Sequence, residues 1–151
     1  MKTSKEIADV LNDLIEIHND RIAGYEKAIR ELKGEDDDLK ILFASLISQS
    51  HKAKGELGTE VQVLGETMET GTTNRGKIYR AWMDVKAAFT SSSAHAVLDN
   101  CEYGEDAALK AYDDALGEED IPAYLRELLL SQQSVLLEAH DEIKSLRDQY
   151  A

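Results

Sequence analysis

Two pairs of residues that could do chemistry stand at the same spacing in two separate parts of the chain. His18 precedes Tyr25 by seven residues, and Glu105 precedes Tyr112 by seven residues. Seven residues make about two turns of an α-helix, so the members of each pair lie on one helical face. An imidazole and a carboxylate can both bind metals and can both build buried hydrogen-bond networks. The spacing therefore indicates a polar site inside a bundle of helices.

The elements that must position these residues are amphipathic helices. Apolar residues recur at intervals of three and four along most of the chain, and His18 and Glu105 each interrupt such an apolar stripe. Thr3 and Glu6 form a capping box at the start of the first helix. Glycines follow three of the helices, where a glycine ends a helix readily. The predicted helices span residues 4–33, 38–69, 77–90, 94–116 and 121–149.

The lengths of the connections predict how the helices are arranged. Short links join the first two long helices and the last two, so each pair should form an antiparallel hairpin. About 25 residues, including the short helix over 77–90, cross from one hairpin to the other, and one long crossover is the ferritin-like connectivity among helical bundles. We therefore predict an all-α, ferritin-like four-helix bundle that forms a single domain over residues 1–151.

Four segments carry a resemblance to a known family. The chain resembles an uncharacterised family of bacterial four-helix proteins, the domain of unknown function 2383, which belongs to the ferritin-like superfamily. The resemblance covers nearly the whole chain, and it implies a fold but no reaction. The matching segments are residues 12–28, Trp82 in the crossover, residues 101–106 continuing to Tyr112, and residues 139–148.

The ligand set of a dinuclear metal centre is incomplete in this sequence. Metal-binding ferritin-like bundles take one Glu from each of two helices and a Glu-x-x-His motif from each of the other two. Glu105 fits the position of a lone Glu, but the equivalent position in the first helix is His18. Neither His51 nor His140 has a Glu three residues before it. The sequence therefore argues against a site for two irons.

The predicted positions of these residues along the bundle axis are compatible with a mononuclear metal site. With the second turn centred near residue 119, Glu105 is level with Gln133, and His140 is about 10 Å further along the helix. In the first hairpin, His18 is level with about Lys54, and His51 is one turn from that position. His18, His51 and Glu105 are thus candidates for a mononuclear site that could hold iron, manganese or zinc.

A buried network without any metal is the alternative interpretation of the same residues. Glu105 could accept hydrogen bonds from His18, from Gln132 or Gln133, or from a tyrosine hydroxyl. Networks of this kind fix the register of packed helices at some cost in stability. In this interpretation the polar core is a degenerate metal site, and the protein needs no cofactor.

Composition limits the partners. Thirty acidic residues against seventeen Lys and Arg give a net charge of −13, which argues against nucleic acid and against anionic membrane surfaces. The single cysteine, Cys101, cannot form an internal disulfide, and we expect it to be a small core residue. The N-terminal residues do not form a signal peptide, and no apolar run is long enough to span a membrane. We therefore expect a cytoplasmic protein.

Two classes of function remain from these observations. The first is a non-enzymatic ferritin-like protein, related to stress or acting as a scaffold, that self-associates as a homo-oligomer. Gly55 and Gly58 in the second helix favour close approach of another helix, from the same chain or from a second subunit. The second class is a metal-dependent oxidase or a metal store. Whether the protein is an enzyme stays open, with the missing ligands favouring no catalysis, and no residue singles out a small apolar ligand.

Overall fold

The computed structural model describes residues 1–32, 36–70 and 93–150. This part of the chain contains four α-helices and no strand: α1 (Ser4–Glu31), α2 (Asp37–Val63), α4 (Ala94–Leu116) and α5 (Ala123–Gln149). The all-α, ferritin-like class predicted from the sequence is therefore confirmed. The helix predicted over 77–90, together with Trp82, lies outside the described residues.

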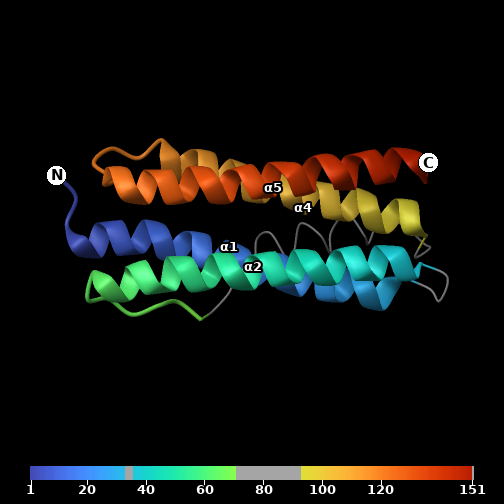
Figure 1. Cartoon of the computed structure of the whole chain (residues 1–151), viewed down its shortest axis with the longest axis horizontal. Coiled ribbons are helices and arrows are strands. Elements are labelled where there is room, and N and C mark those ends of the chain that lie inside the picture. Colours follow the sequence, from blue (N-terminus) through green and yellow to red (C-terminus); the bar gives the residue numbers. More distant parts are fainter. Residues whose placement is uncertain (33–35, 71–92, 151) are drawn as a thin grey trace.

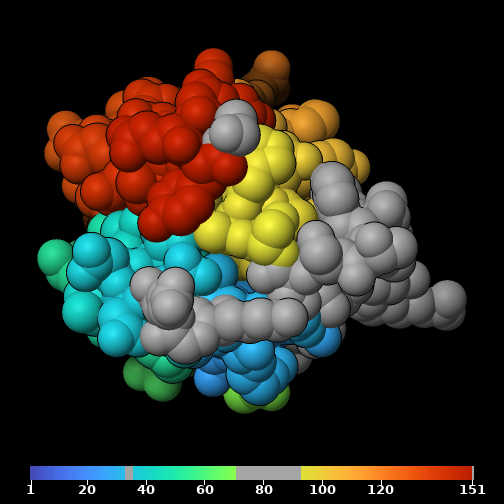
Figure 2. Space-filling view, turned by 90° about the vertical axis from the view of Figure 1, so that its right-hand side faces the viewer, coloured from blue at the N-terminus to red at the C-terminus, as the bar shows by residue number. Residues whose placement is uncertain are grey.

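The helices form two antiparallel hairpins, α1 with α2 and α4 with α5, laid against each other along their length (Figure 1). The end view places the α1–α2 hairpin in the lower half of the molecule and the α4–α5 hairpin in the upper half (Figure 2). Helix α4 runs parallel to α2 and antiparallel to α1, as the crossover predicts. The close contact between the hairpins is that of α1 with α4.

Local sequence explains where the helices begin and end. The Thr3 side chain accepts from the backbone N–H of Glu6, and the Glu6 carboxylate accepts from that of Thr3, which confirms the capping box. Helix α2 ends at Val63, six residues before the predicted end. Gly65 has φ +78°, and the N–H of Glu66 reaches back to the carbonyl of Val61. This is a Schellman motif, so Gly65 ends the helix instead of lying inside it.

The chain then turns back along α2 and is fixed to α1. The Asn12 amide donates to the carbonyl of Thr67 and accepts from the backbone N–H of Glu69, at 3.0 and 2.8 Å. The Met68 side chain lies over Gly58, where a Cβ atom would be 2.5 Å from the Met68 sulfur. Gly58 therefore accommodates a side chain of its own chain. Gly55 is exposed, and a Cβ atom there would meet nothing within 4 Å.

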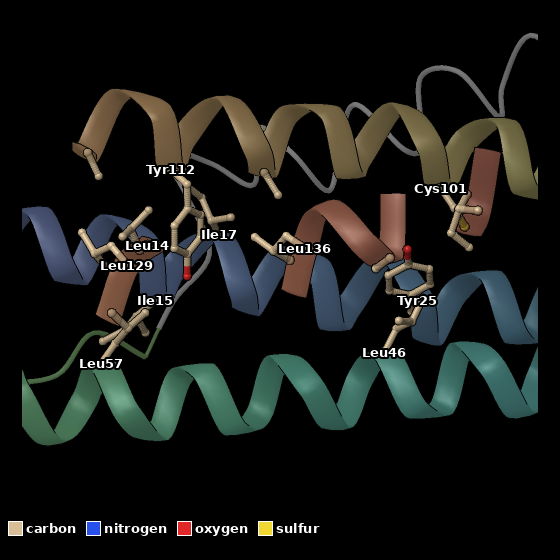
Figure 3. Packing of buried hydrophobic residues seen from close by; sticks show 14 of the residues in the cluster. Leu14, Ile15, Ile17, Tyr25, Leu46, Leu57, Cys101, Tyr112, Leu129 and Leu136 are labelled. Atoms are coloured by element: carbon tan, nitrogen blue, oxygen red, sulfur yellow. The ribbon is translucent and has the colours of Figure 1, made fainter. Parts of the chain in front are cut away.

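The apolar stripes of all four helices meet in one core (Figure 3). Tyr25 and Tyr112 are both fully buried, and the Tyr25 ring packs against Phe43 with the ring centroids 5.3 Å apart. Cys101 is buried in the same core, nearer to Tyr25 than to Tyr112 (Figure 3), and is a core residue as predicted. Among the described residues, no helix is both long and apolar enough to cross a membrane.

Candidate functional site

Polar side chains from all four helices converge in the middle of this apolar core. Their positions follow the apolar stripes, so each replaces an apolar residue at a place that the fold buries. All are at most 6% exposed. The cluster, which we call the core network, consists of His18 and Arg21 from α1, Ser50 from α2, Glu105 and Tyr112 from α4, and Gln132 from α5.

An ion pair between Arg21 and Glu105 is the centre of the core network. The Arg21 Nε lies 2.6 Å from Glu105 Oε1, and one terminal nitrogen lies 3.0 Å from Oε2, so the contact is bidentate. The other terminal nitrogen donates to the Ser50 hydroxyl at 2.9 Å and to the Leu46 carbonyl at 3.2 Å. The guanidinium carbon also lies 5.4 Å from the centre of the Tyr25 ring. Both oxygens of the carboxylate are thus held by a cation that the chain itself supplies.

The remaining members form a hydrogen-bond chain whose direction is fixed. The Gln132 amide nitrogen donates to the carbonyl of Ala53 and to the Glu56 carboxylate, so its oxygen must accept from the Tyr112 hydroxyl, at 2.7 Å. With that proton committed, the Tyr112 oxygen accepts from His18 Nε2, at 2.6 Å. His18 Nδ1 therefore accepts from Ser50, at 3.0 Å, while the Ser50 oxygen accepts from Arg21.

The electrostatics of the core agree with this pattern. Burial, together with the charge of Arg21, lowers the pKa of His18 from 6.5 to about 3, so the imidazole is neutral. Burial lowers the pKa of Arg21, but the Glu105 carboxylate together with Tyr25 and Tyr112 outweighs burial, and the net shift is upward. Burial also raises the pKa of Tyr25 and of Tyr112. The charged members are therefore Arg21 and Glu105 alone, and they neutralise each other.

These residues do not fit a dinuclear metal centre. Such a centre in this fold needs carboxylates from all four helices and two imidazoles. The core network offers one carboxylate, Glu105, and one imidazole, His18, and hydrogen bonds within the network already engage both. Ser50 and Gln132 occupy the inward positions of α2 and α5. A guanidinium thus stands where a bridging metal would have to meet the Glu105 carboxylate.

The structure does not bring His51 to His18 and Glu105. His51 is exposed, and Ser50, the residue before it, points inward and contacts His18. Consecutive residues on a helix point about 100° apart, so only one of the two can face the core. The mononuclear set of His18, His51 and Glu105 that the sequence left open is therefore not assembled.

His140 lies on the outside of the α4–α5 hairpin, in a second polar cluster. Its Nε2 is 2.7 Å from Asp106 Oδ1 and 3.8 Å from Glu102 Oε1. Ligand atoms of Glu102, Asp106 and His140 all lie within 4.8 Å of one another, a grouping that could hold a metal ion. We call these three residues the outer triad. Glu105 points into the core instead, so it and His140 lie on different faces.

The level predicted for His140 along the bundle was wrong. His140 meets Asp106, and Gln133 meets Asp113 at 2.6 Å, so Glu105 is level with residues near 140 instead of 133. The lean of helical side chains toward the N-terminus of their own helix shifts such a contact by about one position in each helix. Most of the difference is therefore an offset in register between α4 and α5. What separates His140 from Glu105 is the face of the helix, not the distance along it.

Arg21 is the functional residue that reasoning from sequence missed. It follows His18 by three residues and precedes Tyr25 by four, so the periodicity places it on the buried stripe as firmly as Ile22. The residues predicted to face inward nevertheless did not include it, although arginine is rarely buried without a partner and a buried one therefore predicts a buried carboxylate. The signal that could have found it was the pairing of this position with Glu105, the other charged residue on a stripe.

A cleft between α2 and α5 reaches the core network from outside. It encloses about 140 Å³, and His18, Arg21 and Gln132 form its inner wall. Lys52 and Glu56 of α2 stand among the residues that line it. The opening lies where the two hairpins pack less closely than along α1 and α4. Its size suits a few waters or a small polar molecule.

A comparison with known protein families identifies the family of this chain. The family model described as a domain of unknown function, DUF2383, matches residues 6–118. The chain belongs to this family. The predicted resemblance is thereby confirmed, and it carries no reaction with it. A comparison with curated proteins gave no match.

Solved structures similar to this DUF2383 protein share its fold at low sequence identity. One is a Dps1 mutant from Mycobacterium smegmatis, with a TM-score of 0.82 and 14% identity, covering 95% of this chain and 96% of that chain. Another is described as a ferritin-like, diiron-carboxylate protein from Bacillus anthracis strain Ames, with a TM-score of 0.69 and 19% identity over the whole of both chains. These similarities establish a ferritin-like bundle and nothing about its chemistry.

Proposed function

We propose that this protein is a non-enzymatic ferritin-like bundle, acting as a stress-related or scaffold protein that self-associates, with an internal ion pair in place of a metal centre. The observation that supports it most is the bidentate contact of the buried Arg21 with both oxygens of Glu105. A metal at Glu105 would have to displace this guanidinium and leave its charge buried without a partner, which costs several kcal/mol.

The rival function is a metal-dependent oxidase or a metal store that uses the core. Metal content separates the two, provided that the outer triad is removed first. Protein carrying His140→Ala is loaded with Fe²⁺, Mn²⁺ or Zn²⁺ and desalted, and the metal is counted by elemental analysis. The proposal expects no stoichiometric metal. Metal that is retained, and then lost when Glu105→Gln is added, would establish the rival.

Support for self-association comes from the outer face of the α4–α5 hairpin. Leu130 and Leu137, two turns apart on α5, are 51% and 49% exposed. Together with Leu109 of α4 they line a shallow groove of about 440 Å³. Apolar side chains grouped in this way are typical of surfaces that bind other proteins. The glycines of α2 give less support than the sequence suggested, because Met68 of the same chain covers Gly58.

Sedimentation velocity tests this half of the proposal. Leu137→Glu places a charge in the groove and should shift the protein toward monomer at a given concentration. Ile41→Glu is the matched control, since Ile41 is 69% exposed on α2 and lies outside the groove. A wild-type protein that stays strictly monomeric at high concentration would remove self-association from the proposal.

A further inference from the structure

The outer triad lies away from the core network, and the proposed function makes no use of it. Glu102 and Asp106 are one turn apart on α4, and His140 faces them from α5. The side chains of Glu102 and His140 are only 13% and 15% exposed, whereas that of Asp106 is 61% exposed. Two members are thus held in place by packing, and the third borders open solvent.

The environment of the His140 ring indicates what the outer triad can bind. Nδ1 lies 3.2 Å from Asp141 Oδ1, and Nε2 faces Asp106 and Glu102. Nε2 and one oxygen from each of two carboxylates are therefore near enough to one another to act as ligands of a single cation. A carboxylate on the far nitrogen of a histidine is the usual support of a metal-binding imidazole.

The charge around the outer triad is also unbalanced. Ion pairs connect five carboxylates on this face, and within the described part of the chain Arg147 is the one permanently charged cation that these ion pairs include. Arg147 binds the second oxygen of Glu102, which leaves the first directed toward His140. The carboxylates are those of Asp99, Glu102, Asp106, Asp141 and Asp148.

We propose that Glu102, Asp106 and His140 form a mononuclear site for a divalent transition-metal ion, with Zn²⁺ as its representative, on the outer face of the α4–α5 hairpin. One imidazole and two carboxylates suit zinc and its first-row neighbours better than Mg²⁺ or Ca²⁺, which take oxygen ligands. Three protein ligands leave a fourth position for water or for a ligand from another molecule. Asp141 is a positioning residue, since it holds the ring so that Nε2 faces the ion.

Isothermal titration calorimetry, in which Zn²⁺ is added to the chelator-stripped full chain, tests the site. We expect one zinc ion per chain, with affinity at least roughly tenfold weaker in His140→Ala and in Asp106→Asn, and roughly tenfold weaker in Asp141→Asn. Asp106 is largely exposed, so its variant keeps the fold. His51→Ala removes an exposed histidine on α2 and should leave the affinity unchanged.

Histidine ¹⁵N NMR identifies the ligand atom directly. Zinc should move the signal of His140 Nε2 while Nδ1 remains protonated. Zinc affinity unchanged in His140→Ala, an equal loss in His51→Ala, or an Nε2 signal that does not respond would each overturn the site. These outcomes are independent of metal binding in the core, because the core test is made in a chain that lacks His140.

Discussion

At the scale of single residues, one buried arginine decides the character of the core. The sequence predicted that His18 and Glu105 face inward, and both are at most 1% exposed. It did not predict their partners, because a helical period assigns a residue to a face but does not say which residue of another helix it meets. Arg21 turns a carboxylate that could have bound a metal into half of an ion pair.

The neutral, buried His18 makes stability depend on pH. Its pKa in the folded protein is about 3, below the ordinary 6.5, so between these values the unfolded chain binds a proton that the folded chain does not. Stability contributed by the neutral imidazole is therefore lost as pH falls below 6.5, and the loss reaches about 2 kcal/mol at pH 5. Urea unfolding at pH 8 and pH 5 measures it.

A His18→Gln variant provides the comparison, because glutamine does not titrate. Its change in unfolding free energy between the two pH values should be smaller than that of the wild type by about 2 kcal/mol. Equal changes in the two proteins would mean that His18 is protonated in the folded core, against the hydrogen-bond directions described above.

At the scale of elements, the ends of the helices show where sequence patterns are ambiguous. The apolar stripe of α2 continues through Leu64 and Met68, so periodicity alone extended the helix to residue 69. The positive φ of Gly65 ends the helix instead. Met68 belongs to the segment that turns back along α2, and its side chain packs against Gly58 of that helix. An apolar residue at the right interval can thus contact the core without being helical.

Gly55 within α2 and Gly65 just after its end give opposite predictions for the same substitution. Gly55→Ala should stabilise the protein by about 0.5–1 kcal/mol, because an exposed helical glycine is less favourable than alanine and the new Cβ meets nothing within 4 Å. Gly65→Ala should destabilise it by about 1–2 kcal/mol, because φ is +78° there. Thermal unfolding of the two variants compares them directly. Effects of the same sign would contradict this description of the end of α2.

At the scale of the whole molecule, the class and topology of the fold were predictable and the site was not. Long stripes, short links and one crossover determine a ferritin-like bundle. The outer triad depends on the register between α4 and α5, and a midpoint count placed Glu105 about two turns from its true level. Sequence patterns carry no information on register at that precision, and the distance predicted between Glu105 and His140 along the bundle was wrong for this reason.

Net charge should govern how copies of the chain associate. With a net charge of −13, two molecules repel each other at low ionic strength, and this repulsion is screened within about 8 Å at physiological salt. Self-association through the apolar groove should therefore strengthen as salt is added. Sedimentation equilibrium from low to high NaCl measures it. Association that weakens with salt would indicate an interface built on opposite charges instead.

The central claim is that Arg21 is the cation that serves Glu105 in the core. A double-mutant cycle of Arg21→Met and Glu105→Gln, read from unfolding free energies, tests it most directly. Each single variant should lose about 3–5 kcal/mol, because it leaves one buried polar partner unmatched, and the double variant should be more stable than the sum of the two losses by about 2–3 kcal/mol. Losses that add to within about 0.5 kcal/mol would show that the two side chains do not depend on each other and would contradict the claim.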